Sequence, residues 1–361
     1  MMTKILLTWR LSPVLVFLIF ISLTGTVSVS GADCPRALNM GPTYQSKTFV
    51  NLYVEGNLKM RSKYRKKDSN NFVSPEEELI NRCSRRLTAN TFSDSLPERL
   101  NVFANQSKES RSGAFVSVSS VDQKMAMEKK GPYWHAYVTA FPDLRFVGAT
   151  IRLAYGLITL DNTIQSVQDL TDKRVGLVMR PSSLRVLQEI VLVNAWDIYD
   201  QIRVKEYSPD DMYDALDQGE VDVVFMPVIR EVNGKLLPIH LDIKRSDIHW
   251  ISLSTQDVIT ATKNTAVLAE RIAFPLSATS ADNYEEVGLI TFDVAWFTFA
   301  STPDDVVYDF LQVARHVCSP KQPNCPGLSV ERLLRWPQLE TRLIHPGAQR
   351  FYKEMEANFY P

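Results

Sequence analysis

Two arginines and two serines gather where one apolar run of the chain breaks, in the segment "VGLVMRPSSLRVLQEI" at residues 175–190. The pattern before Arg180 is that of a buried strand, and the pattern after Ser182 is that of an amphipathic helix. The guanidinium groups of Arg180 and Arg185, with the unpaired N–H groups of a first helical turn, can bind a carboxylate or a phosphate. Capping of the helix by Ser182 or Ser183 explains the serines equally well and contributes about 1 kcal/mol. Anion binding and a purely structural corner are therefore both open.

No established catalytic motif accompanies this corner. The sequence contains no GxSxG, HExxH, P-loop, GxGxxG or CxxC pattern. His240, Asp242 and His249 lie close together in the sequence, but the alternation of an exposed strand explains them better than a metal site does. We therefore expect a protein that is not an enzyme and that needs neither a cofactor nor a metal ion.

The elements that would position the corner alternate between strand and helix. Residues 174–228 have the pattern strand, helix, strand, helix, strand with short connections, which favours parallel strands and right-handed crossovers. Ligands of such sheets bind beyond the carboxyl ends of the strands, where the corner lies. Strands are predicted at residues 49–55, 99–105, 114–121, 145–160, 174–179, 202–207, 221–228 and 286–300.

Three helices are predicted to begin in the same way, at residues 74–77 (Ser-Pro-Glu-Glu), 208–211 (Ser-Pro-Asp-Asp) and 302–305 (Thr-Pro-Asp-Asp). In each, the hydroxyl can cap free N–H groups, proline loses no hydrogen bond in the first turn, and the acids lie at the positive end of the helix dipole. The second of these helices is predicted to end at Gly219.

The first 32 residues are typical of a secretory signal peptide. Lys4 and Arg10 accompany an apolar stretch that is shorter than the roughly 20 residues of a membrane-spanning helix, and small residues predict cleavage after Ala32. The roughly 330 residues that remain are more than one hydrophobic core usually supports, so two domains are expected. Removing Lys4 and Arg10 changes the net charge from -1 to -3, which gives no support to nucleic-acid binding.

Four cysteines in an exported chain indicate disulfide bonds, with three possible pairings. Cys318 and Cys325 bracket a short loop that contains prolines and that a local bridge could close, which leaves Cys34 to pair with Cys83. This pairing is favoured over the other two.

Several segments together resemble one family, the TAXI-type solute receptors of tripartite (TRAP) transporters, a branch of the type II periplasmic binding proteins. Residues 162–185 resemble the stretch that leads through a strand into the family's Gly-Ser-Gly-Thr-Arg type of loop. Residues 212–228 resemble its helix, glycine and strand element, and residues 287–316 its return strand and following helix. The segment "HPGAQRFYKE" at 345–354 is similar to the family's terminal His-Pro-Gly-Ala signature. The resemblance covers residues 114–354.

The resemblance implies an α/β fold of two lobes joined by long hinge strands, a type II periplasmic-binding-protein clamshell. Its expected parts are a signal peptide at 1–32, the first part of lobe 1 at 33–160, lobe 2 at 161–285, and the return strand with the rest of lobe 1 at 286–361. It further implies a periplasmic, monomeric receptor that closes on a small anionic solute, such as an amino acid, dicarboxylate or keto acid. TRAP-type permease subunits in the membrane would be its partners.

The ligand-binding residues are carried over position by position. Ser182 matches the loop serine of the family, Ser183 the following glycine, Leu184 the threonine and Arg185 the arginine, and Arg180 lies across the same loop. Three further candidates complete the predicted site, namely Ser120 and Asp122 in a first-lobe corner and Met226 in the strand at 221–228.

The first lobe departs from the family pattern. A charged segment at 51–79 stands in place of the expected glycine-rich loop, and the loop after the strand predicted at 99–105 is shorter than in the family. The alternative function is therefore a divergent periplasmic sensor or protein-interaction module that keeps the two-lobe scaffold and no longer carries a solute.

Overall fold

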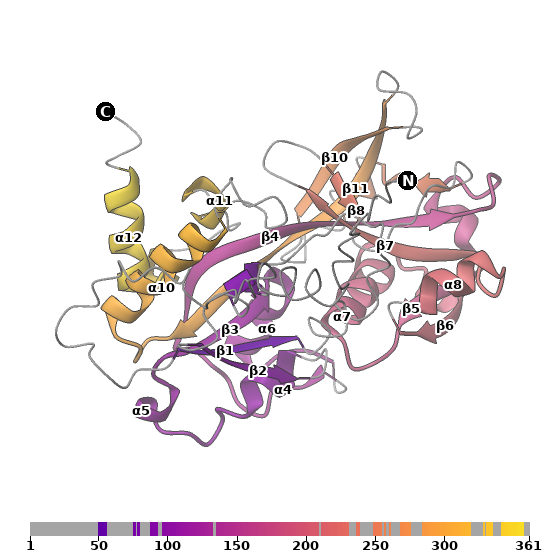
Figure 1. Cartoon of the computed structure of the whole chain (residues 1–361). Helices are drawn as coiled ribbons and strands as arrows, with labels where there is room; N and C mark the ends of the chain where they lie inside the picture. Colours follow the sequence, from indigo (N-terminus) through magenta and orange to yellow (C-terminus); the bar gives the residue numbers. More distant parts are fainter. Residues whose placement is uncertain are drawn as a thin grey trace, which may run out of the picture.

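The computed structural model places the described strands in one mixed sheet with helices on both faces (Figure 1). The structure describes residues 50–55, 75–76, 78–79, 87–92, 96–132, 135–208, 211–230, 236–238, 248–254, 256–257, 260, 268–275, 284–318, 328, 330–334 and 341–356. The strands are β1 (Val50–Glu55), β2 (Leu87–Phe92), β3 (Ala114–Ser119), β4 (Leu144–Thr159), β5 (Arg174–Val178), β6 (Arg203–Tyr207), β7 (Val223–Arg230), β8 (Leu236–Pro238), β9 (His249–Ile251), β10 (Leu268–Pro275) and β11 (Tyr284–Phe299).

The α-helices are α4 (Leu96–Asn101), α5 (Lys108–Arg111), α6 (Ser120–Glu128), α7 (Ser183–Glu189), α8 (Asp211–Asp217), α10 (Asp304–Val317), α11 (Val330–Leu334) and α12 (Pro346–Glu356). Shorter 3-10 turns are η3 (Val167–Leu170), η5 (Tyr199–Gln201) and η6 (Thr341–Leu343), and α7 continues into a π-helical segment, η4 (Ile190–Ala195). In the part of the chain that the structure describes, no helix combines the length and apolar character needed to cross a bilayer.

The two halves of the sheet repeat one strand order. Three parallel strands in the order β2-β1-β3 lie beside the antiparallel strand β11, and three more in the order β6-β5-β7 lie beside the antiparallel strand β4. Strands β4 and β11 are each 16 residues long and pair with one another, so they run from one half into the other. The predicted α/β fold of two lobes joined by long hinge strands is confirmed, whereas the residue boundaries of the lobes stay a prediction.

Each lobe has a hydrophobic cluster on either face of its sheet. In the first lobe, α10, α11 and α12 pack on one face, and α4 and α6 pack on the other. In the second lobe, α7 with its π-helical continuation covers one face and α8 covers the other. Burial of these apolar helix faces on both sides of the sheet is the main stabilising term of each three-layer lobe.

The sheet is two strands wide between the lobes, as judged from the described residues. β7 pairs with β4 from Leu153 onward, and β3 pairs with β11 from Val294 onward. Between these levels Arg152 of β4 lies opposite Asp293 of β11, and its guanidinium group donates two hydrogen bonds of 3.0 Å to the carboxylate. A register shift follows at Val294, whose carbonyl accepts a hydrogen bond of 3.1 Å from the hydroxyl of Thr150. This waist is the narrowest connection of the sheet.

The predicted strands are observed with one exception, residues 99–105. These residues form the end of helix α4 and a turn, so the prediction was wrong. Leu100 and Phe103 are buried and Val102 is 38% exposed, which is the one-sided spacing of a helix that packs on the sheet. The run was too short for this spacing to be told from that of a strand. Strand β2, which pairs in parallel with β1, was not predicted because its residues are mostly polar or small.

The predicted helix starts occur where the structure describes them. Residues 75–76 and 78–79 are helical. Helix α8 begins at Asp211, whose N–H group donates to the hydroxyl of Ser208 over 3.2 Å, and Gly219 beyond its end has a left-handed φ of 68°.

Helix α10 begins as predicted, but the hydroxyl of Thr302 does not cap it. That hydroxyl accepts a hydrogen bond of 3.2 Å from the N–H group of Gly113 and bonds to the hydroxyl of Thr298 over 2.7 Å. The hydroxyl therefore ties the start of α10 to neighbouring strands, a long-range role that the local sequence does not reveal.

The predicted disulfide pairing is not tested by the described residues. Cys318 is buried at the end of α10 and is not a free cysteine. The other three residues of the predicted bridges, Cys34, Cys83 and Cys325, lie outside the described residues, as does the predicted signal peptide at 1–32.

We expect Asp293→Asn to lower the free energy of unfolding by about 3–5 kcal/mol, because it removes a completely buried carboxylate and leaves the half-buried guanidinium group of Arg152 without that charge. Urea denaturation of the two proteins measures the difference. Asp172→Asn is the matched control, since Asp172 is 81% exposed and lies 3.8 Å from Arg203, and the change should stay within about 1 kcal/mol. Equal effects of the two substitutions would show that the waist pair does not stabilise the fold.

Candidate functional site

The corner after β5 has the local structure that the sequence predicts. Strand β5 ends at Val178, and Ser182 is the N-cap of α7, where its hydroxyl accepts a hydrogen bond of 3.2 Å from the N–H group of Leu184. The peptide bond between Arg180 and Pro181 is cis. The capping explanation is thus correct for Ser182, while the Ser183 hydroxyl is shielded and has no hydrogen-bond partner.

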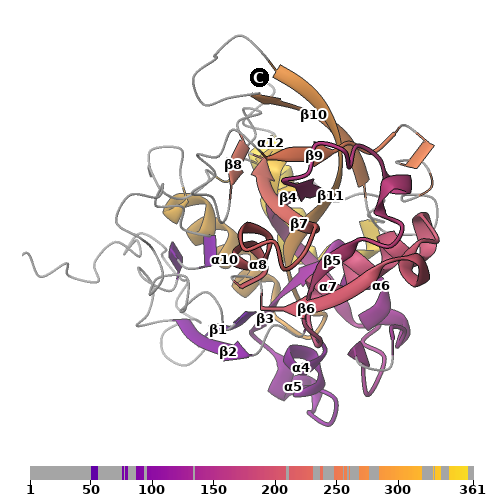
Figure 2. The same ribbon diagram turned by 90° about the vertical axis from the view of Figure 1, so that its right-hand side faces the viewer.

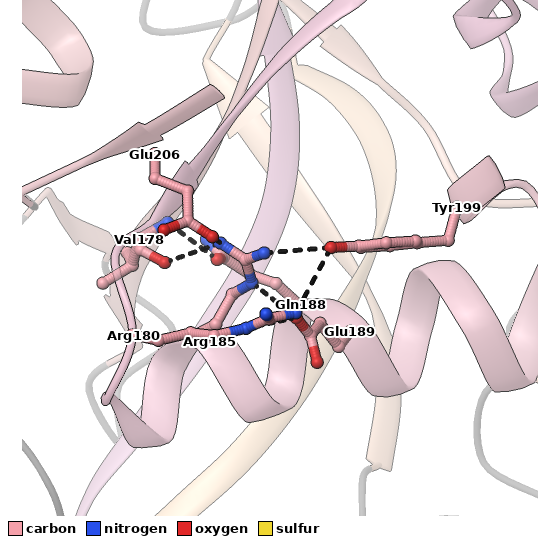
Figure 3. A network of polar contacts seen from close by, with 7 residues as sticks. All are labelled: Val178, Arg180, Arg185, Gln188, Glu189, Tyr199 and Glu206. Atoms are coloured by element: carbon pink, nitrogen blue, oxygen red, sulfur yellow. Dashed lines mark hydrogen bonds and ion pairs between the residues drawn. The ribbon is translucent and has the colours of Figure 1, made fainter. Parts of the chain in front are cut away.

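Arg185 is completely buried and has four partners from four elements of the second lobe (Figure 3). Its Nε donates to Glu189 over 2.8 Å, its Nη1 to the carbonyl of Val178 over 3.0 Å, and its Nη2 to the hydroxyl of Tyr199 over 3.0 Å. The same Nη1 lies 3.0 Å from a carboxylate oxygen of Glu206. These contacts join the end of β5 to α7, η5 and β6.

Arg180 contacts the same carboxylate from the other side of the loop. Its Nε donates to Oε1 of Glu189 over 3.1 Å, its Nη2 contacts the same oxygen, and Nη2 also lies 3.5 Å from the hydroxyl of Tyr199. Burial alone would lower the pKa of Arg180, but the hydrogen bond and the charge of Glu189 raise it. The guanidinium group therefore stays charged, and its charge is balanced within the lobe.

A glutamine links the corner to the hinge strand. The carbonyl oxygen of Gln188 accepts a hydrogen bond of 3.0 Å from the N–H group of Val178, and its amide donates to the hydroxyl of Tyr155 in β4 over 2.8 Å. Tyr155 stacks on Phe225 of β7 with 5.2 Å between ring centroids. Burial raises the pKa of the Tyr155 hydroxyl despite the opposing hydrogen bond from Gln188. Helix α7 thus binds both the N–H and the carbonyl of Val178.

The two apolar candidates lie in packing positions. Leu184 is half-buried and packs against clusters on both sheet faces of the second lobe. Met226 is 1% exposed and lies in the cluster beneath α8. Their positions favour a role in packing over direct contact with a solute.

The first-lobe corner contains a second buried polar cluster. Ser119 is the N-cap of α6, and its hydroxyl accepts from the N–H group of Asp122 over 3.2 Å and donates to its carboxylate over 2.6 Å. The other carboxylate oxygen of Asp122 lies 2.7 Å from Nε2 of His135 and accepts from the hydroxyl of Tyr137 over 3.3 Å. Asp122 and His135 are both completely buried, and the predicted candidate Ser120 is the first residue of α6.

The environment of Asp122 favours its charged form. Burial alone would raise the pKa of the carboxyl group, but hydrogen bonds from His135 and Ser119, together with the charges of His135 and Arg99, lower it. Arg99 is itself anchored by a hydrogen bond of 3.1 Å to the carbonyl of Ser117 in β3.

The two corners meet where the lobes meet. Helices α6 and α7 each follow the carboxyl end of a parallel strand, and they lie against one another (Figures 1 and 2). Met125 of α6 packs against hydrophobic clusters of both lobes. The sequence-predicted candidates of the two lobes are thus brought to one side of the sheet, with the exception of Met226 on the α8 face.

The sequence interpretation missed the residues that surround the arginines. Glu189 lies four residues after Arg185, a spacing that indicates an ion pair on a helix and could have been recognised. Tyr199 and Glu206 come from η5 and β6, and no local signal connects them to the corner. In the residues that the structure describes, no group of three or more His, Cys, Asp or Glu side chains is placed to hold a metal ion.

Comparison with known proteins identifies no family for this chain. A search of protein-family models found no match. Similar solved structures include MatC from Rhodopseudomonas palustris with bound malate (12% sequence identity over 86% of this chain and 97% of that chain, TM-score 0.45) and R. palustris Rpa4515 with adipate (15%, 86% and 94%, TM-score 0.45). Another is the alkanesulfonate-binding protein SsuA from Xanthomonas axonopodis pv. citri bound to MOPS (13%, 86% and 85%, TM-score 0.39). All three TM-scores are below 0.5.

We expect Arg185→Met to lower the free energy of unfolding by about 3–5 kcal/mol, since it removes a buried charge and leaves the carboxylate of Glu189 and the carbonyl of Val178 without a main partner. Arg180→Met is the comparison variant and should cost about 1 kcal/mol, because the Arg180 side chain is 32% exposed. Guanidinium chloride denaturation followed by circular dichroism measures both. Wild-type stability of Arg185→Met would contradict a structural role for this arginine.

We expect Asp122→Asn to be less stable than the wild type at pH 7, and we expect this difference to narrow as the pH falls from 5 to 3. The lowered pKa means that the carboxylate stabilises the fold above the ordinary aspartate pKa of about 3.9, and that this contribution is lost as the pH falls through the lower value of the folded state. Urea denaturation at pH 7, 5 and 3 measures the difference. The exposed Asp200→Asn is the control and should change little at any pH. A difference for Asp122→Asn that stays constant down to pH 3 would exclude this account.

Proposed function

We propose that this chain is an exported solute-binding protein, of the TAXI type that the sequence resembles. Its two lobes hold a small solute between them and deliver it to TRAP-type permease subunits in the membrane. The observation that carries the proposal is the repeated strand order of two α/β lobes, joined by the two-stranded waist at Arg152 and Asp293.

The placement of the two corners supports this function. Ligands of open α/β sheets bind beyond the carboxyl ends of the strands, and α6 and α7 begin at such ends on facing sides of the lobe junction. A solute that binds both lobes has a higher affinity for the closed form than for the open form. Solute binding therefore shifts the protein toward the closed form, which a permease can distinguish from the open form.

The sequence predicts a small anionic solute, such as an amino acid, dicarboxylate or keto acid. Arg180 and Arg185 no longer support that prediction, because Glu189 and Glu206 balance their charges. The anionic class therefore rests on the family resemblance alone, and the solute panel has to include neutral compounds.

Thermal denaturation with a panel of amino acids, dicarboxylates, keto acids and their uncharged amides tests the proposal. One class should raise the unfolding temperature in a saturable way, because a ligand at 100 times its dissociation constant adds about 2.7 kcal/mol of stability. Native mass spectrometry of the purified protein shows any solute that copurifies. If no compound stabilises the protein and none copurifies, solute binding is rejected in favour of the sensor or interaction module.

A further inference from the structure

We propose that Glu189 is a built-in carboxylate that occupies the anion position of the second-lobe corner and makes this corner reject anionic groups. The inference rests on the proposed function and refines its substrate class. The part of the solute that contacts the second lobe is then uncharged.

The geometry of Glu189 is that of a bound anion. One oxygen, Oε1, accepts from Nε of Arg180 over 3.1 Å and from Nε of Arg185 over 2.8 Å, so a single carboxylate bridges both guanidinium groups (Figure 3). Charge-assisted hydrogen bonds of this kind are the ones that an anionic ligand would make with the same two arginines. Glu189 therefore takes the contacts on which anion recognition at this corner depends.

The charge balance of the corner also argues against binding of an anionic group. Glu206 lies 3.0 Å from Arg185, so two guanidinium groups face two carboxylates and their charges sum to zero. The side chain of Glu189 is 16% exposed and that of Arg185 is 1% exposed, which limits screening by water. An incoming carboxylate meets no net positive charge and is repelled by a carboxylate that is already in place.

Two N–H groups at the helix start are also already bound. The N–H group of Leu184 is bound by the hydroxyl of Ser182, and the N–H group of Val186 donates to the carbonyl of Ser182 over 3.1 Å. Ser182 thus caps α7, and Glu189 and Glu206 neutralise Arg180 and Arg185.

Glu189→Gln tests the proposal, because glutamine keeps the size and the Oε1 acceptor and removes the charge. Sodium sulfate is titrated against sodium chloride at constant ionic strength, and binding is measured by calorimetry and by the unfolding temperature. Wild type should show no sulfate-specific effect, whereas Glu189→Gln should bind sulfate in a saturable way, at least tenfold more tightly than the upper limit set for wild type. The exposed Asp200→Asn makes the same change in net charge and should behave as the wild type. Adding Arg180→Met to Glu189→Gln should abolish the gain.

A folded Glu189→Gln protein with the same sulfate response as wild type overturns the proposal. Should this variant not unfold cooperatively, Arg180→Met alone decides. Sulfate binding by wild type that Arg180→Met removes would show that Glu189 does not block the corner, whereas no sulfate effect in either protein agrees with a blocked corner. The result is separate from solute binding itself, since the panel of solutes can identify a ligand whatever the response to sulfate.

Discussion

A guanidinium group that is buried without water has to be surrounded by acceptors and balanced by charge, and this requirement shapes the second lobe. Arg185 draws the carbonyl end of β5, a carboxylate of α7, a hydroxyl of η5 and a carboxylate of β6 to one point. Removing any one of these four partners would leave the buried guanidinium group with an unbalanced charge or an unpaired N–H group, which destabilises the fold. Four elements are therefore held in register by one side chain.

The same need for charge balance explains the residues around both corners. The first-turn position of Arg185 opposes the helix dipole, and the nearby carboxylates compensate for it. In the first lobe, Asp122 shows the mirror-image solution, a buried carboxylate at the start of α6 that is surrounded by donors. In both corners the buried charge is therefore balanced by residues of the same lobe.

Much of the fold could be predicted because its signals are local. Strand patterns, the capping serine at 208 and Gly219 depend on neighbours in the chain, and these predictions are confirmed. The failures involve contacts between distant segments. Residues 99–105 form the end of helix α4 and a turn because Leu100 and Phe103 pack on the sheet, and the hydroxyl of Thr302 bonds to Gly113 rather than capping α10. Tyr199 on η5 and Glu206 on β6 could not be predicted as partners of Arg185 for the same reason.

Strand β11, which returns from the second lobe to the first, determines when the sheet of the first lobe can be completed. The hydroxyl of Thr298 donates to the carbonyl of Ala114 over a separation of 184 residues, and β3 has β11 as its antiparallel neighbour. Contacts over such separations carry a large loop-closure entropy and form slowly. During synthesis, the first lobe has to wait for the strand that completes its sheet until the whole second lobe has been made. The chain therefore emerges with an unpaired sheet edge, which exposes it to aggregation until β11 has been made.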